Sequence, residues 1–165
     1  MPKWLLAVLV VVGVASLASP IVATVLNVTG MTFVGSRGST REVVLHSREA
    51  VFRAEEGVAE LLDVEAEVSI HADEGPSFTM FCDEAELNLE TNDFVARGHV
   101  HGVTRDGQRY RAPWVEYVHE GGVLSTTAPV VMEDDSGSFS GDGFRYHVRE
   151  RRFHLLGNVR VEQVP

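Results

Sequence analysis

Histidines and serines are the residues whose types and spacing could support chemistry in this sequence. His99 and His101 are two positions apart, so in a β-strand both side chains would point to one face and could share a metal ion. No third ligand stands at a suitable spacing, so we expect no metal. The serines at 136, 138 and 140 lie in the stretch "DDSGSFSG", which lacks the strand–turn–helix context of a catalytic serine. We therefore expect no enzyme and no cofactor.

Composition describes a single acidic domain. The chain has 165 residues and a formal net charge of −10, and no stretch indicates the clustered positive surface that binds nucleic acid. The single cysteine, Cys82, cannot form an internal disulfide. Because its neighbours in "FTMFCDEAEL" are largely apolar, we predict that it is a small buried residue of the core.

The N-terminal stretch from Leu5 to Leu26 contains no charged residue. A helix rises ~1.5 Å per residue, so this stretch could cross the bilayer core of about 30 Å. Lys3 precedes it and the next charge is Arg37, which predicts a cytoplasmic N-terminus and an exported remainder. We predict two parts, residues 1–27 with a transmembrane anchor and residues 28–165 as the exported domain. A signal peptide cleaved at "ASLAS" is the alternative.

Three similar phrases recur along the exported part. They are "FVARGHVH" (94–101), "LSTTAPVV" (124–131) and "FHLLGNVR" (153–160). Each follows a second strand-like phrase, and turn signals such as "RDGQ" and "EGG" separate the phrases. Apolar and polar residues alternate within them, which predicts repeated antiparallel hairpins with one apolar and one wet face.

Stacked hairpins of this kind predict an all-β domain. Two sheets folded onto each other, as in a jelly roll, would enclose the apolar face in a long slot. Alternate residues of each repeated strand point to the apolar face, and we expect these residues to line the slot: Leu87, Leu89, Phe94, Val100, Val115, Tyr117, Leu124, Val130, Met132, Phe144, Tyr146, Phe153, Leu155 and Val159. The same residue types serve in a packed core and in an interior held open for a lipid, so the pattern leaves both possibilities.

Two features bear on the width and extent of the slot. Small residues at inward positions, among them Ala96, Gly98, Ala128 and Gly157, either leave room inside or mark bulges. The segment 58–68, "VAELLDVEAEV", is rich in Glu and fits a strand or a short amphipathic helix. The first half of the slot is therefore less well defined than the second.

The apolar N-terminus is followed in order by "DEAELNLETNDFVARGHVHG", the "APV" strand and the "SGDGF" turn before the last hairpin. In this order the chain resembles, from residue 4 onward, the LptC family, the bitopic inner-membrane component of the lipopolysaccharide export system. The resemblance implies a twisted β-jelly-roll of repeated antiparallel hairpins that forms an open apolar groove. It also implies a single N-terminal transmembrane helix in the cell inner membrane and a C-terminal domain in the periplasm.

The resemblance further implies a route for lipid. The groove would receive lipopolysaccharide acyl chains from the ABC transporter subunits LptB, LptF and LptG and pass them to the bridge protein LptA through edge-to-edge strand pairing. The strand around Met31 and Phe33 would face the transporter. The C-terminal edge strand would pair with LptA through Phe153, Leu155, Val159 and Val161.

The sequence is also compatible with other functions. If the N-terminus is cleaved, the domain would be a soluble bridge protein of the LptA kind. A membrane-anchored scaffold β-domain with a filled core and no lipid ligand is an alternative of another class. Hydrolysis of an envelope glycan ranks third, because it needs two carboxyl groups that converge in a cleft, whereas the carboxylates here lie along the wet face.

Overall fold

The computed structural model describes residues 25–69 and 75–163. They form twelve β-strands: β1 (Val25–Arg37), β2 (Thr40–Arg53), β3 (Val58–Val68), β4 (Phe78–Asn88), β5 (Phe94–Thr104), β6 (Arg109–Val118), β7 (Val123–Thr126), β8 (Val130–Asp134), β9 (Gly137–Gly141), β10 (Gly143–His147), β11 (Arg152–Leu156) and β12 (Arg160–Gln163). Residues 58–68, which fitted either a strand or a helix, are strand β3.

The predicted anchor lies almost entirely outside the described residues, which begin at Val25. Strand β1 also begins there, so the sheet includes residues 25–27, which we had assigned to the anchor part of the chain. No helix among the described residues is long and apolar enough to cross a membrane.

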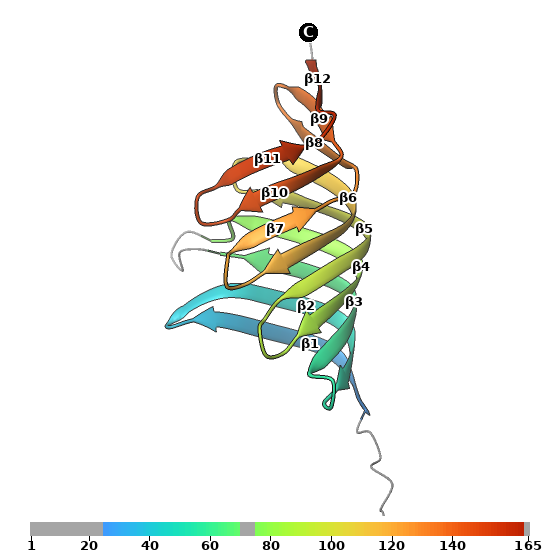
Figure 1. Cartoon of the computed structure of the whole chain (residues 1–165). Helices are drawn as coiled ribbons and strands as arrows, with labels where there is room; N and C mark the ends of the chain where they lie inside the picture. Colours follow the sequence, from blue (N-terminus) through green and yellow to red (C-terminus); the bar gives the residue numbers. More distant parts are fainter. Residues whose placement is uncertain (1–24, 70–74, 164–165) are drawn as a thin grey trace, which may run out of the picture.

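All twelve strands belong to one antiparallel sheet that does not close on itself. Its order is β1-β2-β3-β4-β5-β6-β7-β10-β11, while β8 pairs with β6 and β9, and β9 pairs with β12. The strands are stacked from β1 at one end of the molecule to β11 and β12 at the other (Figure 1). The sheet therefore has two edges, β1 and the C-terminal pair β11 and β12.

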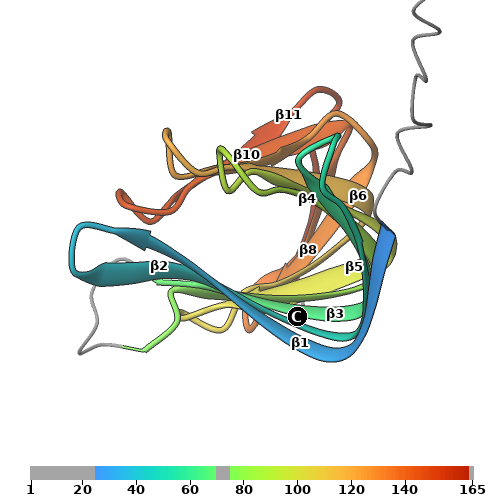
Figure 2. The ribbon, with the colours of Figure 1, turned by 90° about the horizontal axis from the view of Figure 1, so that it is seen from below.

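The strand path is bent near its middle, where the pairing register is interrupted. The interrupted positions of neighbouring strands lie next to each other and form a line across the sheet, which we call the corner. The corner contains Gly30, Arg48, Asp63, Asp83, Gly98–His99, Pro113, 127–129, Asp142 and 157–159. Seen from below, the strands turn at this line and continue in another direction, so the sheet has a V-shaped profile (Figure 2).

Local chemistry explains the bend. Asp63 and His99 have φ angles of 50° and 43°, which an extended strand does not contain. Pro113 has no N–H to donate to the sheet, and two residues of β5 stand opposite it as a bulge. Gly98 has φ +73°, and an added Cβ would lie 2.6 Å from Asp83 Oδ2, so a residue without a side chain is required at this point.

The corner divides the sheet into two arms. The first arm ends at turns 38–39, 105–108 and 135–136, and the second at turns 54–57, 89–93, 119–122 and 148–151. The inner faces of the arms oppose each other, and we call the side where the ends of the arms approach one another, away from the corner, the mouth (Figure 2). We call the region between the two inner faces, which buried side chains fill, the slot.

The predicted repeat is visible in the pairing register. Glu84 pairs with Arg97 in the hairpin β4–β5, and Gly143 pairs with Leu156, 59 residues later, in the hairpin β10–β11. The same offset relates the outer halves of these strands, because Phe81 pairs with His101 and Ser140 pairs with Arg160. Strands β9 and β10 together therefore correspond to β4, and β11 and β12 together correspond to β5.

Candidate functional site: an apolar slot with open edges

Most of the residues predicted to line the slot are buried between the two arms. Buried are Leu87, Phe94, Val100, Val115, Tyr117, Leu124, Val130, Met132, Phe144 and Tyr146, while Leu89, Phe153 and Leu155 are partly buried. Val159 is different, because 50% of its surface is exposed. It corresponds to the buried Val100 by the 59-residue offset, but it lies at the edge of the sheet, where no further hairpin covers it.

Aromatic side chains join the two arms inside the slot. Phe78 of the first arm stacks on Tyr146 of the second with ring centroids 5.5 Å apart, and Tyr110 meets Phe144 edge to face at 5.5 Å. The Phe144 ring stacks in turn on Phe153 at 4.9 Å. Contacts of this kind add about 0.5–1.5 kcal/mol each beyond the burial of their area. The arms are therefore held together by side chains inside the slot.

The slot is less covered toward the two edges of the sheet. At the β1 edge, Val28, Met31 and Phe33 pack against the core but are only partly buried. At the other edge, Phe153 and Leu155 are also partly buried, and Val161 is 55% exposed. An apolar inner face thus extends from one edge strand to the other and is only partly covered at both ends.

Both edge strands carry unpaired backbone groups and exposed apolar side chains. Val25 and Leu26 of β1 are 54% and 56% exposed. Leu156 and Val161 lie exposed at the opposite edge. An edge of this kind can accept a strand from another chain. Met31 lies on β1 and Phe153 on β11, so the strands predicted as partner edges are edge strands of this sheet, with β12 beside β11 at the C-terminal edge.

Sequence reasoning missed the lining contributed by β2, β3 and the first half of β4. Val43, Leu45, Leu61, Phe78 and Met80 are all buried in the same core. Apolar and polar residues do alternate on each side of the corner in these strands. The alternation changes phase at the corner, so one unbroken period does not place both halves of a strand on the inner face. Cys82 is buried as predicted, and burial raises the pKa of its thiol to about 12.

Two hydroxyl groups inside the slot have no hydrogen-bond partner among the described residues. Tyr110 is 2% exposed, and its Oη atom accepts and donates no hydrogen bond; Ser47 Oγ is in the same state. Burial raises the pKa of Tyr110 well above its ordinary value. An unsatisfied buried donor costs about 1–3 kcal/mol, so these groups are polar points in an otherwise apolar interior.

The two histidines considered as metal ligands lie on the outer face at the corner. His99 Nδ1 is 2.6 Å from Asp83 Oδ2, whereas the ring of His101 stacks on Phe81 at 5.4 Å. His101 Nδ1 bonds instead to the backbone oxygen of His99 at 2.8 Å. Because β5 bulges at this point, the two rings have different partners and do not converge on a common point.

Comparison with known proteins identifies the fold. No family model and no curated protein matches the sequence. Among solved structures, the chain is similar to LptH of Pseudomonas aeruginosa, described as the LptA-homologous periplasmic component of the conserved lipopolysaccharide transport device, with a TM-score of 0.60. The similarity covers 74% of this chain and 95% of LptH at 10% sequence identity. This chain has the LptH fold. The predicted all-β jelly-roll architecture is therefore confirmed, and the sheet is open as expected.

Proposed function

We propose that this chain is a lipid carrier of a lipopolysaccharide transport system and not an enzyme. In this proposal acyl chains of lipopolysaccharide lie in the slot, between the inner faces of the two arms. The observation that carries it is the continuous apolar face that is only partly covered at both edge strands. A filled core that needed only to be stable would gain from covered ends, whereas a carrier must pass its ligand through them.

The energetics favour the acyl chains as the part that is bound. The chain carries a net charge of −10, so it repels an anionic headgroup at long range. Transfer of each CH₂ group from water into an apolar interior contributes ~0.8 kcal/mol. A chain of about twelve carbons would then contribute about 10 kcal/mol, which is enough to replace several of the contacts that now join the arms.

The finer proposal is that the chain acts as an LptC-type component. Its N-terminus would anchor it in the inner membrane, the β1 edge would meet the transporter subunits LptB, LptF and LptG, and the β11–β12 edge would pair with LptA. The support for this assignment is the uncharged N-terminal stretch and the two open edges. If the N-terminus is cleaved, the same domain would act as a soluble periplasmic bridge. Measurement of the intact mass of the protein shows whether cleavage occurs.

The scaffold alternative also has an observation in its favour. Leu87 and Leu124 are fully buried, as the residues of a packed core would be. The two functions differ in whether the arms separate to admit lipid.

The test is site-specific photo-crosslinking in the full chain. A photo-reactive residue replaces Leu87 or Val130 inside the slot, or His101 on the outer face as the matched control. After irradiation with lipopolysaccharide, adducts at the two inner positions and none at His101 are expected of a carrier. Equal labelling at all three positions, or labelling at none, would favour the scaffold.

A further inference from the structure

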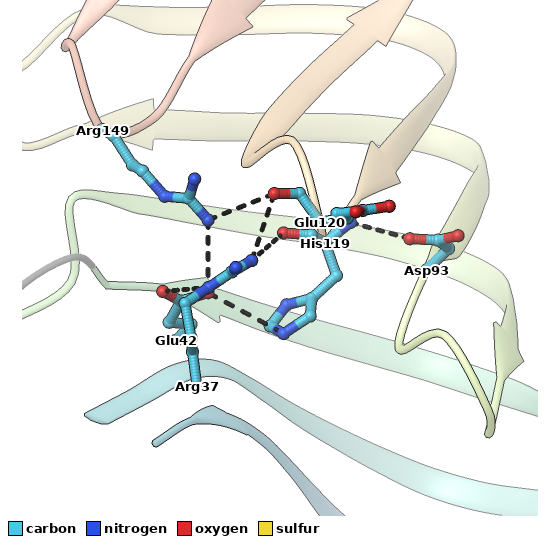
Figure 3. Close-up of polar contacts among 6 residues, drawn as sticks. All are labelled: Arg37, Glu42, Asp93, His119, Glu120 and Arg149. Atoms are coloured by element: carbon cyan, nitrogen blue, oxygen red, sulfur yellow. Dashed lines mark hydrogen bonds and ion pairs between the residues drawn. The ribbon is translucent and has the colours of Figure 1, made fainter. Parts of the chain in front are cut away.

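A cluster of charged residues joins the two arms at the mouth (Figure 3). Arg37 and Glu42 belong to the β1–β2 hairpin of the first arm, whereas His119 and Arg149 belong to turns of the second arm. Arg37 Nε lies 3.0 and 3.1 Å from the two carboxylate oxygens of Glu42. Glu42 Oε2 is also 3.8 Å from Arg149 Nη2 and 3.8 Å from His119 Nε2. One carboxylate is therefore surrounded by three basic groups.

The arginines also bind the backbone of the second arm. Arg37 Nη2 donates to the carbonyl oxygens of His119 and Glu120, at 2.9 and 3.2 Å. Arg149 Nη2 donates to the Glu120 carbonyl at 3.3 Å, so both guanidinium groups meet at one turn. The nearby Asp93 accepts from the backbone N–H of His119 at 2.7 Å and thereby holds this turn in place.

Burial differs between the carboxylate and the two arginines. The Glu42 and His119 side chains are 11% and 10% exposed, and His119 Nδ1 has no hydrogen-bond partner in the part of the chain that the structure describes. By contrast, the Arg37 and Arg149 side chains are 45% and 42% exposed. The carboxylate is thus enclosed, while the arginines that hold it can be reached from solvent.

The cluster adjoins the slot directly. The His119 ring meets the ring of Tyr117, a lining residue, at 6.1 Å. Burial and, after it, the negative charge of Glu42 raise the pKa of Tyr117. An amphiphile whose chains lay in the slot beside Tyr117 would therefore place its headgroup next to Arg37 and Arg149.

We propose that Arg37, Arg149 and His119 form a phosphate-binding site at the mouth, and that Glu42 occupies this site until the phosphate group of an amphiphile displaces it. The inference rests on the proposed lipid-carrier function. Guanidinium groups bind carboxylates and phosphates with the same geometry, so a carboxylate held in this way marks a place that suits phosphate. A phosphate also has more acceptor oxygens and more charge than the carboxylate that it replaces.

Displacement of Glu42 would couple headgroup binding to opening of the slot. Glu42 contacts Arg149 and His119 across the mouth, whereas its contact with Arg37 lies within the β1–β2 hairpin. Once phosphate takes its place, the β1–β2 hairpin loses the Glu42 contacts with the second arm and keeps those that Arg37 makes with the carbonyl oxygens of His119 and Glu120. The headgroup would thus loosen the mouth at the moment when the acyl chains need to enter.

The test compares Glu42→Gln and Arg37→Gln in the full chain, reconstituted in phosphatidylcholine nanodiscs with empty nanodiscs as the blank. The matched control is the pair Arg111 and Glu133, which form an exposed ion pair at 2.8 Å on the outer face; each is also changed to Gln. Calorimetric titration measures the Kd for monododecyl phosphate, for dodecyl maltoside and for inorganic phosphate.

Opposite effects of the two variants are expected. Glu42→Gln should bind monododecyl phosphate about tenfold more tightly, and Arg37→Gln about tenfold less tightly, because each changes one charged contact. The Kd for dodecyl maltoside and both control variants should stay unchanged. Tighter binding of both amphiphiles by both variants would show that the cluster only fastens the mouth, and unchanged phosphate affinity in both variants would exclude the site.

The remaining outcomes separate this inference from the proposed function. If Glu42→Gln binds inorganic phosphate as tightly as monododecyl phosphate, the ligand is free phosphate and the headgroup assignment is wrong. If dodecyl maltoside binds but the variants do not affect phosphate, lipid carriage stands and only the headgroup site fails. If the wild-type chain binds neither amphiphile, the carrier function itself fails and the inference falls with it.

Discussion

Replacing Leu87 by alanine should lower the stability of the empty domain, and lipopolysaccharide should restore part of the loss. The Leu87 side chain is fully buried and stands opposite Ala59 on β3 and Phe94 on β5. Leu→Ala changes at such sites cost about 2–5 kcal/mol, since the apolar contact is lost and a cavity remains. At about 2–4 °C per kcal/mol for a domain of this size, the Tm should fall by roughly 4–20 °C.

Ligand binding makes this change informative about function. A ligand at a hundred times its Kd stabilises the protein that binds it by about 2.7 kcal/mol. In a carrier, an acyl chain can fill the space that Leu87 leaves, so the variant should gain more stability from lipopolysaccharide than the wild type does. The assay is thermal unfolding of the full chain with and without lipopolysaccharide. Glu86→Ala, on the exposed face of the same strand, is the control and should change stability by less than about 0.5 kcal/mol. If the Tm difference between Leu87→Ala and wild type is the same with and without ligand, the acyl chains do not enter the slot.

Three further predictions concern the corner and the interior. Gly98→Ala should destabilise the domain more than Gly107→Ala, because both glycines have positive φ but only at Gly98 would the added Cβ lie against Asp83. Denaturant unfolding measures the difference in free energy of unfolding. Equal losses would show that Asp83 moves away from the new Cβ without cost. Tyr110→Phe should raise the stability of the empty domain by about 1–3 kcal/mol, because it removes an unpartnered buried hydroxyl, and a lowered Tm would mean that this hydroxyl has a partner. Cys82, whose pKa is raised to about 12, should resist alkylation at pH 8 in the folded state and react once the chain unfolds; mass spectrometry across a denaturant series checks this, and rapid labelling of the folded chain would contradict it.

The part of the fold that the sequence predicts well is the part where the strand period is unbroken. Leu87 follows Ala85, and Tyr117 follows Val115, at the two-residue spacing of a strand, and all four are buried. The second half of the slot could be assigned for this reason. The register also contains the repeat that the three similar phrases indicated.

Prediction weakened at the corner, for a physical reason. Asp63 has φ 50°, so the residues on either side of it, Leu61 and Val64, are three apart and yet both face inward. With Val68 four residues later, this spacing imitates the apolar stripe of a helix. The segment 58–68 was ambiguous because a bent strand produces helical spacing, and nothing local in the sequence reveals the bend.

The same corner explains how a slot filled by side chains could still open. Among the described residues, the two arms are joined by backbone only through the strands that run through the corner. No backbone–backbone hydrogen bond joins the arms across the mouth. Separation of the arms would therefore break side-chain contacts, chiefly the aromatic pairs of Phe78 and Tyr110 and the cluster around Glu42, and would leave the ladders of both arms intact. The corner already lacks regular pairing, so it can absorb the change in angle. The contacts that would be lost are apolar inside the slot and ionic at the mouth. An amphiphile with acyl chains and an anionic headgroup could therefore replace both kinds of contact.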